Sequence, residues 1–226
     1  MGLTLKPQIQ QHNLRQQVLE ILKTRLISGK LASGEIYSAA ALAAELGVSN
    51  SPVREAMLTL VNQGLMETVR NRGFRVIPIR RKQLEDIYSV RLLLEIPSIR
   101  KLATIPDEVR KVEPELRAKL ADLRRHADQD DIVAYLTVDK GFHLQLLGIL
   151  NNPCLVSTVE TLRDQVRQYG VGGVSAQTIL SRSATEHEDI LEAILAGDAP
   201  KAAELMTSHI YQLIEDWSGT ISKQAS

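Results

Sequence analysis

The sequence predicts a mostly α-helical protein with an N-terminal winged helix-turn-helix, residues 1–79, followed by an antiparallel six- or seven-helix bundle, residues 80–226. Three observations lead to this prediction. The first eighty residues carry the order helix, helix, turn, helix, hairpin. The chain from about residue 82 onward has helical spacing and no strand pattern, and the breaks between its helical segments are short. A chain of 226 residues is long enough for two domains.

The first domain contains three helical segments and a hairpin. Apolar residues at helical spacing in "LRQQVLEILKTRLISGKLASG" predict a helix that stops at Gly29. In "YSAAALAAELG", Ser38 is a good N-cap and Gly47 a good C-terminal stop. The next segment, "SPVREAMLTLVNQG", has Pro52 in its first helical turn. The runs "LMETVR" and "FRVIPI", on either side of "NRG", are typical of a β-hairpin.

The second domain is predicted to be helical throughout. Its first segment, "KQLEDIYSVRLLLEIPSIRKLAT", is long and amphipathic and is expected to bend at Pro97, and "PELRAKLADLRRHAD" follows Pro114. Four more helices are expected in residues 131–150, in "PCLVSTVETLRDQVRQYG", in "AQTILSRSATEHEDILEAILAG" and in "DAPKAAELMTSHIYQLIEDW". The short loops between them are marked by "NNP", "GVGG" and "GD".

Composition and charge narrow the class of protein. The apolar fraction is 44%, no apolar run reaches the length of a membrane helix, and the single cysteine, Cys154, forms no intrachain disulfide. We therefore expect a cytoplasmic protein without membrane contact. The net charge of zero is unevenly divided, because residues 1–80 carry ten Lys and Arg against five Glu, while residues 81–226 carry 17 against 22 Asp and Glu. The net charge is therefore +5 for residues 1–80 and −5 for residues 81–226. The basic first domain is expected to bind a polyanion.

The stretch "LAAELGVSNSPVREAM" has the features of a DNA-reading helix-turn-helix. An apolar helix, a glycine turn and a second helix with polar residues at its N-terminal edge allow that edge to reach bases and phosphates. The residues expected at this edge are Ser49, Asn50, Ser51 and Arg54. Arg70, Arg72 and Arg75 on the hairpin are expected to contact the adjacent backbone or minor groove. The alternative is a helical hairpin whose charged residues are only solvated.

Residues 10–79 also resemble a known family. The segment "GKLASGEIY…LAAELGVSNSPVREAMLTLVNQGLMETVRNRGFRV" closely resembles the N-terminal domain of GntR-family bacterial transcription regulators. The resemblance implies that Arg54 and Gly73 lie at the DNA and that the partner is double-stranded operator DNA. The family usually has Arg after "GVS", whereas this chain has Asn50, whose amide suits adenine or a phosphate. The usual operator preference is therefore not carried over to this chain.

Three of the five histidines lie on apolar faces of three separate predicted helices, and one of them has an aspartate one turn before it. The four residues are Asp139, His143, His187 and His209. One interpretation is a set of core side chains satisfied by backbone carbonyls; the other is a divalent metal that turns all four into ligands. Zn²⁺ is the first candidate, and Ni²⁺, Mn²⁺ and Co²⁺ also suit such ligands. His12 and His126 have no such placement, and Glu186 and Glu188 are expected to face solvent.

Residues 82–218 resemble the FCD domain, the C-terminal effector domain of the FadR subgroup of the GntR family, through the order "D…FH…NNP…EH…AI…GD…A…M…H". In its metal-binding members the Asp and the three His at these positions hold the ion, and the effector is commonly a small carboxylate or hydroxycarboxylate. The resemblance places Arg91 in the effector pocket, and the alternative is an ion pair with Glu95 at i+4. Arg163 and Arg167 are further effector-binding candidates.

Three functions are compatible with these features. The leading hypothesis is a homodimeric transcription regulator, a repressor, whose operator binding is controlled by a small carboxylate at the metal. The second is a regulator whose metal is purely structural and whose effector binds elsewhere. The third is a metal-dependent enzyme acting on an organic acid, with Glu95 as its candidate general base. It leaves the basic first domain unexplained, so we expect no enzyme.

Overall fold

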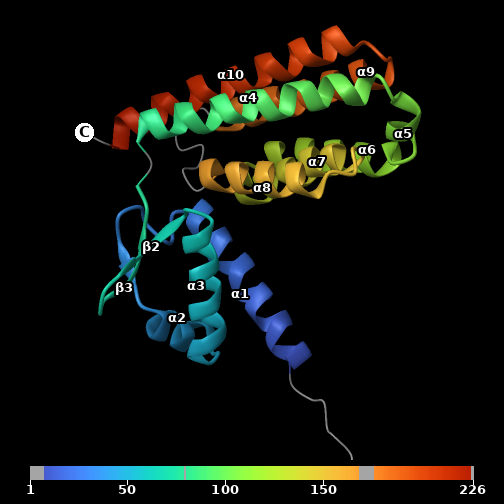
Figure 1. Cartoon of the computed structure of the whole chain (residues 1–226). Coiled ribbons are helices and arrows are strands. Elements are labelled where there is room, and N and C mark those ends of the chain that lie inside the picture. The colour runs from blue at the N-terminus through green and yellow to red at the C-terminus, as the bar shows by residue number, and fades with distance from the viewer. Residues whose placement is uncertain (1–7, 79, 168–175, 225–226) are drawn as a thin grey trace, which may run out of the picture. The chain divides into compact units, whose positions relative to one another are not determined.

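The computed structural model of the chain describes residues 8–78, 80–167 and 176–224. The described residues form ten helices and one three-stranded antiparallel sheet, which confirms the predicted mostly helical fold class (Figure 1). The chain divides into two compact units, Met1–Pro78 and Ile79–Ser226. Among the described helices, none combines the length and the apolar character that crossing a membrane requires.

The N-terminal unit combines three helices with a small sheet. Its elements are α1 (Gln8–Ile27), β1 (Ile36–Tyr37), α2 (Ala39–Leu46), α3 (Asn50–Asn62), β2 (Met66–Val69) and β3 (Gly73–Val76). The strand order is β1-β3-β2, so β3 pairs with both other strands. β2 and β3 form the predicted hairpin, in which Met66 lies opposite Val76. β1 was not predicted, because a strand of two residues is too short to show an alternating pattern.

Helix α2 is bounded at both ends by capping residues. The backbone N–H of Ala41 donates to Ser38 Oγ over 3.1 Å, which caps the N-terminus of α2. Gly47 ends α2 in the left-handed conformation, with φ of 67°. The buried side chains of α3 include Val53, Met57 and Leu60. The opposite face of α3 is exposed to solvent, and the polar residues at the N-terminus of the helix lie on it.

The C-terminal unit contains seven described helices. They are α4 (Arg81–Ala103), α5 (Pro106–Arg110), α6 (Glu113–Asp128), α7 (Ile132–Gly148), α8 (Pro153–Arg167), α9 (Ala176–Leu195) and α10 (Ala199–Gln224). The short helix α5 was not predicted. α4 continues through Pro97 for its last turns, so this proline does not end the helix. The predicted "GVGG" loop lies outside the described residues.

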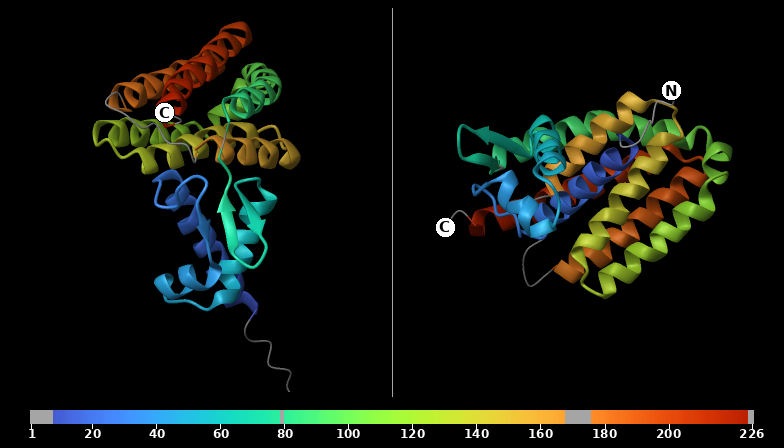
Figure 2. Two further views of the ribbon diagram at one scale, coloured as in Figure 1. Left: turned by 90° about the vertical axis from the view of Figure 1, so that its left-hand side faces the viewer. Right: turned by 90° about the horizontal axis from the view of Figure 1, so that it is seen from below.

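The helices of this unit pack in two layers. Figure 1 shows α4 and α10 along one side and α6, α7 and α8 along the other, and Figure 2 shows the same separation from a second direction. α9 packs against both α10 and α6. Buried side chains such as Leu102, Phe142 and Ile190 form the core. Because α4 contacts α7, α8, α9 and α10, side chains from five helices can meet around it.

Candidate metal centre and DNA-contacting helix

The structure brings together all four residues of the predicted metal set. Asp139 and His143 come from α7, His187 from α9 and His209 from α10. One ligand atom from each of the four lies within 4.8 Å of the others, and all four residues are buried. The i, i+4 spacing places the two α7 residues on one helix face, as predicted. The packing of α9 and α10 supplies the other two.

The distances within this cluster are those of hydrogen bonds and are also compatible with a shared cation. His143 Nε2 lies 2.9 Å from His187 Nε2. Asp139 Oδ1 lies 3.0 Å from His187 Nε2 and 3.7 Å from His143 Nε2. Donor atoms bound at about 2.0–2.1 Å to one Zn²⁺ lie roughly 3 Å from one another. The observed spacing of these three atoms therefore fits a shared metal ion.

The Nδ1 atoms of His187 and His209 each lie against an oxygen acceptor, an arrangement in which Nε2 can serve as the ligand atom when a metal is bound. His187 Nδ1 lies 2.5 Å from the carbonyl oxygen of Ser183, and His209 Nδ1 lies 2.7 Å from Glu186 Oε2. An Nδ1–H that donates to either oxygen leaves a lone pair on Nε2. His209 Nε2 is buried and has no hydrogen-bond partner among the described residues. A buried nitrogen with an unused lone pair, in a residue that lies beside three other possible ligands, is what a metal site requires.

The structure corrects the expectation for Glu186, which was predicted to face solvent. Its side chain is 19% exposed and orients His209. Sequence spacing did not indicate this role, because the partner lies on another helix. The neighbouring Glu188 pairs with Arg124 across helices α9 and α6 and is half-buried.

The electrostatic environment keeps the ligands in their metal-binding protonation states. Burial, together with Arg163, holds the pKa of His143 well below its usual value. Burial and the neighbouring His187 lower the pKa of His209 to about 4. Burial raises the pKa of Asp139, but the hydrogen bond with His187 and the nearby His143 and Arg163 outweigh it, so the pKa lies well below the usual value. At neutral pH the carboxylate is charged, and the imidazoles of His143 and His209 are neutral.

A buried network of four alternating charges adjoins the cluster. Arg91 Nε donates to Glu95 Oε1 over 2.7 Å, and Arg163 Nη2 donates to Glu95 Oε2 over 2.5 Å. Arg163 Nη1 also donates to Asp139 Oδ2 over 3.2 Å. Arg91 therefore makes the i+4 ion pair with Glu95 that is the alternative to an effector role, but the pair is buried and not at the surface. Arg167, the third effector candidate, has a side chain outside the described residues.

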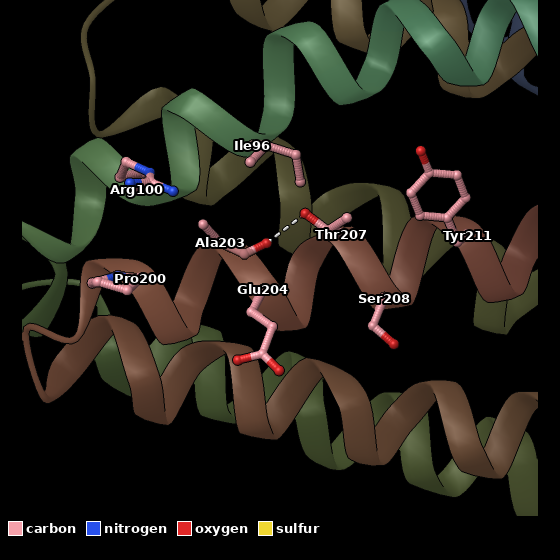
Figure 3. A pocket seen from close by; sticks show the side chains of 8 residues that line it. All are labelled: Ile96, Arg100, Pro200, Ala203, Glu204, Thr207, Ser208 and Tyr211. Atoms are coloured by element: carbon pink, nitrogen blue, oxygen red, sulfur yellow. Dashed lines mark hydrogen bonds between the residues drawn. The ribbon is translucent and has the colours of Figure 1, made fainter.

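A groove of about 430 Å³ lies apart from this cluster, between α4 and α10. Figure 3 shows Arg100 and Ile96 on its α4 side and Ala203, Thr207 and Tyr211 on its α10 side. The hydroxyl of Thr207 donates to the carbonyl of Ala203 over 2.7 Å, so it is turned back onto its own helix. Large apolar side chains are also exposed on α4 and α10. They are Val90 at 40%, Leu93 at 74% and Tyr211 at 53%.

The predicted DNA-reading residues lie at the exposed N-terminal end of α3. Ser49 adopts the extended N-cap conformation but makes no side-chain cap hydrogen bond, and Asn50 begins the helix. Arg54 is exposed one turn further on. The hydroxyl of Ser51 donates to Glu55 Oε1 over 3.0 Å. Ser49, Asn50 and Arg54 therefore keep their polar groups available to nucleic acid.

Of the three arginines on the hairpin, two are exposed and one is in an ion pair. Arg70 and Arg72 are exposed at the turn between β2 and β3. Arg75 pairs with Glu67 across the strands, with 2.6 Å between Nη1 and Oε1. Gly73 has φ of 130°, and a Cβ added there would lie 2.3 Å from the carbonyl oxygen of Tyr37. Glycine is therefore required by the close approach of β1 to β3.

Comparison with known proteins agrees with both halves of the structure. The family model "Bacterial regulatory proteins, gntR family" matches residues 14–76, and the FCD domain model matches residues 86–212. The HTH-type transcriptional repressor RspR of Escherichia coli (strain K12) is 26% identical over 205 residues, which cover 89% of this chain and 88% of that protein. The probable D-xylose utilization operon transcriptional repressor of Paenarthrobacter nicotinovorans is 27% identical over 194 residues, covering 86% and 84%.

A solved structure extends the agreement to the fold of the whole chain. Escherichia coli McbR/YncC superposes with a TM-score of 0.79 at 25% identity, over 92% of this chain and 98% of that one. The gntR match falls on the winged helix, and the FCD match falls on the helices that carry the histidine cluster. The chain is thus a DNA-binding transcription regulator and not an enzyme, and it belongs to the GntR family of bacterial regulatory proteins, with a C-terminal FCD domain.

Proposed function

We propose that this regulator is a repressor whose operator binding depends on a divalent metal and a small carboxylate effector in the helical unit. The observation that carries the proposal is the convergence of Asp139, His143, His187 and His209, with His209 Nε2 unpartnered in a buried site. Two of the similar proteins are named as transcriptional repressors, which supports the direction of control.

The four residues of the cluster would hold the metal. Three imidazole nitrogens and one carboxylate oxygen suit Zn²⁺ first, and also Ni²⁺, Mn²⁺ or Co²⁺. When bound, the ion supplies positive charge and coordination positions for ligand oxygens. Glu186 and the Ser183 carbonyl orient His209 and His187 toward it.

Charge balance supports an anionic effector. Arg91 and Arg163 are balanced by Glu95 and Asp139, and a metal-bound imidazole is neutral. A divalent metal therefore adds two positive charges to a buried site, which an incoming carboxylate or hydroxycarboxylate offsets. Arg91 and Arg163 are the residues we expect to hold its far oxygen atoms, because guanidinium groups match carboxylates in geometry and charge.

The N-terminal unit would read operator DNA through α3 and the hairpin. Asn50 and Arg54 are the candidates for base contacts, and Ser49, Arg70 and Arg72 for phosphate or minor-groove contacts. Asn50, in place of the usual Arg, favours an adenine at the corresponding operator position. One such unit covers one half-site, so a dimer is needed for a pseudo-palindromic operator.

We assign the dimer contact to the α4–α10 face. Its apolar side chains, Val90, Leu93 and Tyr211, are exposed in the isolated chain, and the groove between the two helices offers them a surface to pack against. The exposed Arg100 and Glu204 at this face have opposite charge, so Arg100 of one copy can pair with Glu204 of a second copy.

Elemental analysis of the purified protein tests the metal proposal. We expect about one equivalent of transition metal per chain in the wild type, and its loss in His143→Ala/His209→Ala. His126→Ala is the matched control, because His126 lies outside the cluster and should leave the metal content unchanged. A wild type that takes up none of Zn²⁺, Ni²⁺, Mn²⁺ or Co²⁺ would contradict the proposal.

The role of the metal in regulation needs a second measurement. DNA fragments selected by the protein from a random library provide an operator probe, and simple carboxylates can then be screened for release of the bound fragment. The proposal requires that release disappears in His143→Ala while the DNA affinity of that variant stays close to the wild type. If metal removal lowers only the melting temperature and leaves effector affinity unchanged, the metal is structural and the effector binds elsewhere.

A further inference from the structure

Glu95 on α4 lies between the two arginines proposed to hold the effector. Its Oε1 accepts from Arg91 Nε over 2.7 Å, and its Oε2 accepts from Arg163 Nη2 over 2.5 Å. The Glu95 side chain is 1% exposed, and its Oε2 lies 3.9 Å from His143 Nδ1. A carboxylate of the protein therefore already occupies the two guanidinium groups beside a candidate metal ligand.

The two arginines have more donors than Glu95 uses. Each guanidinium carries five N–H groups in a planar fork. Arg91 Nη2 and Arg163 Nε are buried and have no hydrogen-bond partner among the described residues. Arg163 also donates to Asp139 Oδ2, and the Arg91 guanidinium lies 5.0 Å from the centre of the Tyr88 ring. Unsatisfied buried donors are unfavourable, so the pair gains from further acceptor oxygens.

We propose that Glu95 is an internal substitute for the effector: it holds Arg91 and Arg163 while no ligand is bound, and the carboxylate of an entering effector takes its place on them. This inference rests on the carboxylate effector proposed above and adds the residue through which that effector acts. Both carboxylates are attracted to the same two guanidinium groups, and two like charges side by side in a buried site repel each other, so they compete for this position.

Displacement of Glu95 has a consequence for α4. A buried carboxylate without its partners is strongly unfavourable, so Glu95 must move toward water or toward new donors, and α4 carries it. Glu95 is buried, whereas Leu93, two residues earlier on the same helix, is the most exposed large apolar side chain of those described. Effector binding on the inner face of α4 would therefore shift the outer face that we assign to the dimer contact.

Chemical rescue tests the substitution directly. Glu95→Ala removes the internal carboxylate and leaves space for formate or acetate between the arginines. We expect its melting temperature to be lower than that of the wild type and to rise with formate along a saturable curve at constant ionic strength. Wild-type protein, whose arginines are occupied, should show no such curve. Glu160→Ala is the matched control, because Glu160 is a half-exposed partner of Lys140 outside the network.

A second variant decides the result if Glu95→Ala does not fold. Glu95→Gln keeps the size of the side chain but removes the competing charge, so it should bind formate at least tenfold more tightly than the wild type by calorimetry. Adding Arg91→Ala to Glu95→Gln should abolish that gain, whereas adding Lys101→Ala, which removes the same charge from an exposed position of α4, should leave it in place. If formate affinity is equal in Glu95→Gln and in the wild type, the proposal is wrong.

Metal analysis on the same samples separates this inference from the proposed function. Bound metal without any formate response in either Glu95 variant overturns the role of Glu95 and leaves the metal-dependent regulator intact. A formate response in protein that takes up no metal supports the role of Glu95 and overturns the metal-dependent regulator.

Discussion

His209 Nδ1 lies 2.7 Å from Glu186 Oε2, so a carboxylate on α9 orients a candidate metal ligand on α10. Glu186→Gln should weaken metal binding by about 10–100-fold, because the carboxylate fixes the imidazole and raises its basicity. Competition with a chelating dye measures the affinity. Glu188→Gln is the control, since Glu188 pairs with Arg124 and not with a residue of the histidine cluster. Equal losses in both variants would argue against the orienting role.

The metal-free protein should lose stability as the pH falls from about 6.5 toward 4. The pKa of His209 is lowered to about 4 and that of His143 is also lowered, whereas an unfolded histidine has a pKa of about 6.5. In this window the unfolded chain binds more protons than the folded chain, so the free energy of unfolding rises with pH. The slope should be about 1.4 kcal/mol per pH unit for each such histidine. Urea unfolding of metal-stripped protein at a series of pH values measures it, and His209→Asn should have a smaller slope.

Gly73→Ala should disrupt the hairpin and its pairing with β1. The added Cβ would lie 2.3 Å from the Tyr37 carbonyl oxygen, so a strand has to shift. We expect a loss of about 1–3 kcal/mol or more, and weaker DNA binding. Gly29→Ala is a matched control with φ of 72° and no atom within 4 Å of the new Cβ, so it should cost less. Thermal unfolding followed by circular dichroism measures both losses, and a larger loss in Gly29→Ala than in Gly73→Ala would contradict the prediction.

Arg54→Ala should reduce operator affinity by about 1–3 kcal/mol. Arg54 is exposed at the N-terminal part of α3, and among the residues that the structure describes it has no ion pair that would be lost with the side chain. Lys111→Ala removes an exposed lysine from the helical unit and serves as the control for net charge. Fluorescence anisotropy at several salt concentrations measures the change. Arg54 has no role in DNA binding if both variants behave alike.

Leu93→Glu should convert the dimer into a monomer. Leu93 is 74% exposed in the single chain, and a buried carboxylate in the apolar contact would be unfavourable. Ala118→Glu places the same charge at an exposed position of α6 and should leave the dimer unchanged. Light scattering coupled to size exclusion gives the mass. A Leu93→Glu variant with the wild-type mass would place the contact elsewhere.

The fold was predictable where local chemistry determines it. Helical spacing, the Ser38 cap and the Gly47 stop define α2 and its turn without reference to the rest of the chain. β1 and α5 were missed because each is short and depends on its neighbours. β1 forms because it pairs with β3, with Tyr37 opposite Phe74. A two-residue segment has no sequence pattern from which such a partner could be predicted.

The candidate site was predictable only in part, for a related reason. Asp139 and His143 share a face because they are four residues apart on one helix. His187 and His209 come close to them because the helices pack against one another. The distances between helices cannot be read from the spacing of residues in the sequence. The role of Glu186 was not predictable for the same reason, because its partner His209 lies on another helix. The burial of Glu95 likewise depends on Arg163, which lies on α8.

The two oriented histidines differ in how mutation can affect them. The Nδ1 of His187 is paired with the backbone carbonyl of Ser183, a group that every amino acid carries. Substitutions at position 183 that keep α9 helical should therefore preserve the orientation of His187. His209 depends on the side chain at position 186, so a single base change in that codon can release it. Among descendants of this protein, drift in metal affinity should therefore begin at the α10 ligand.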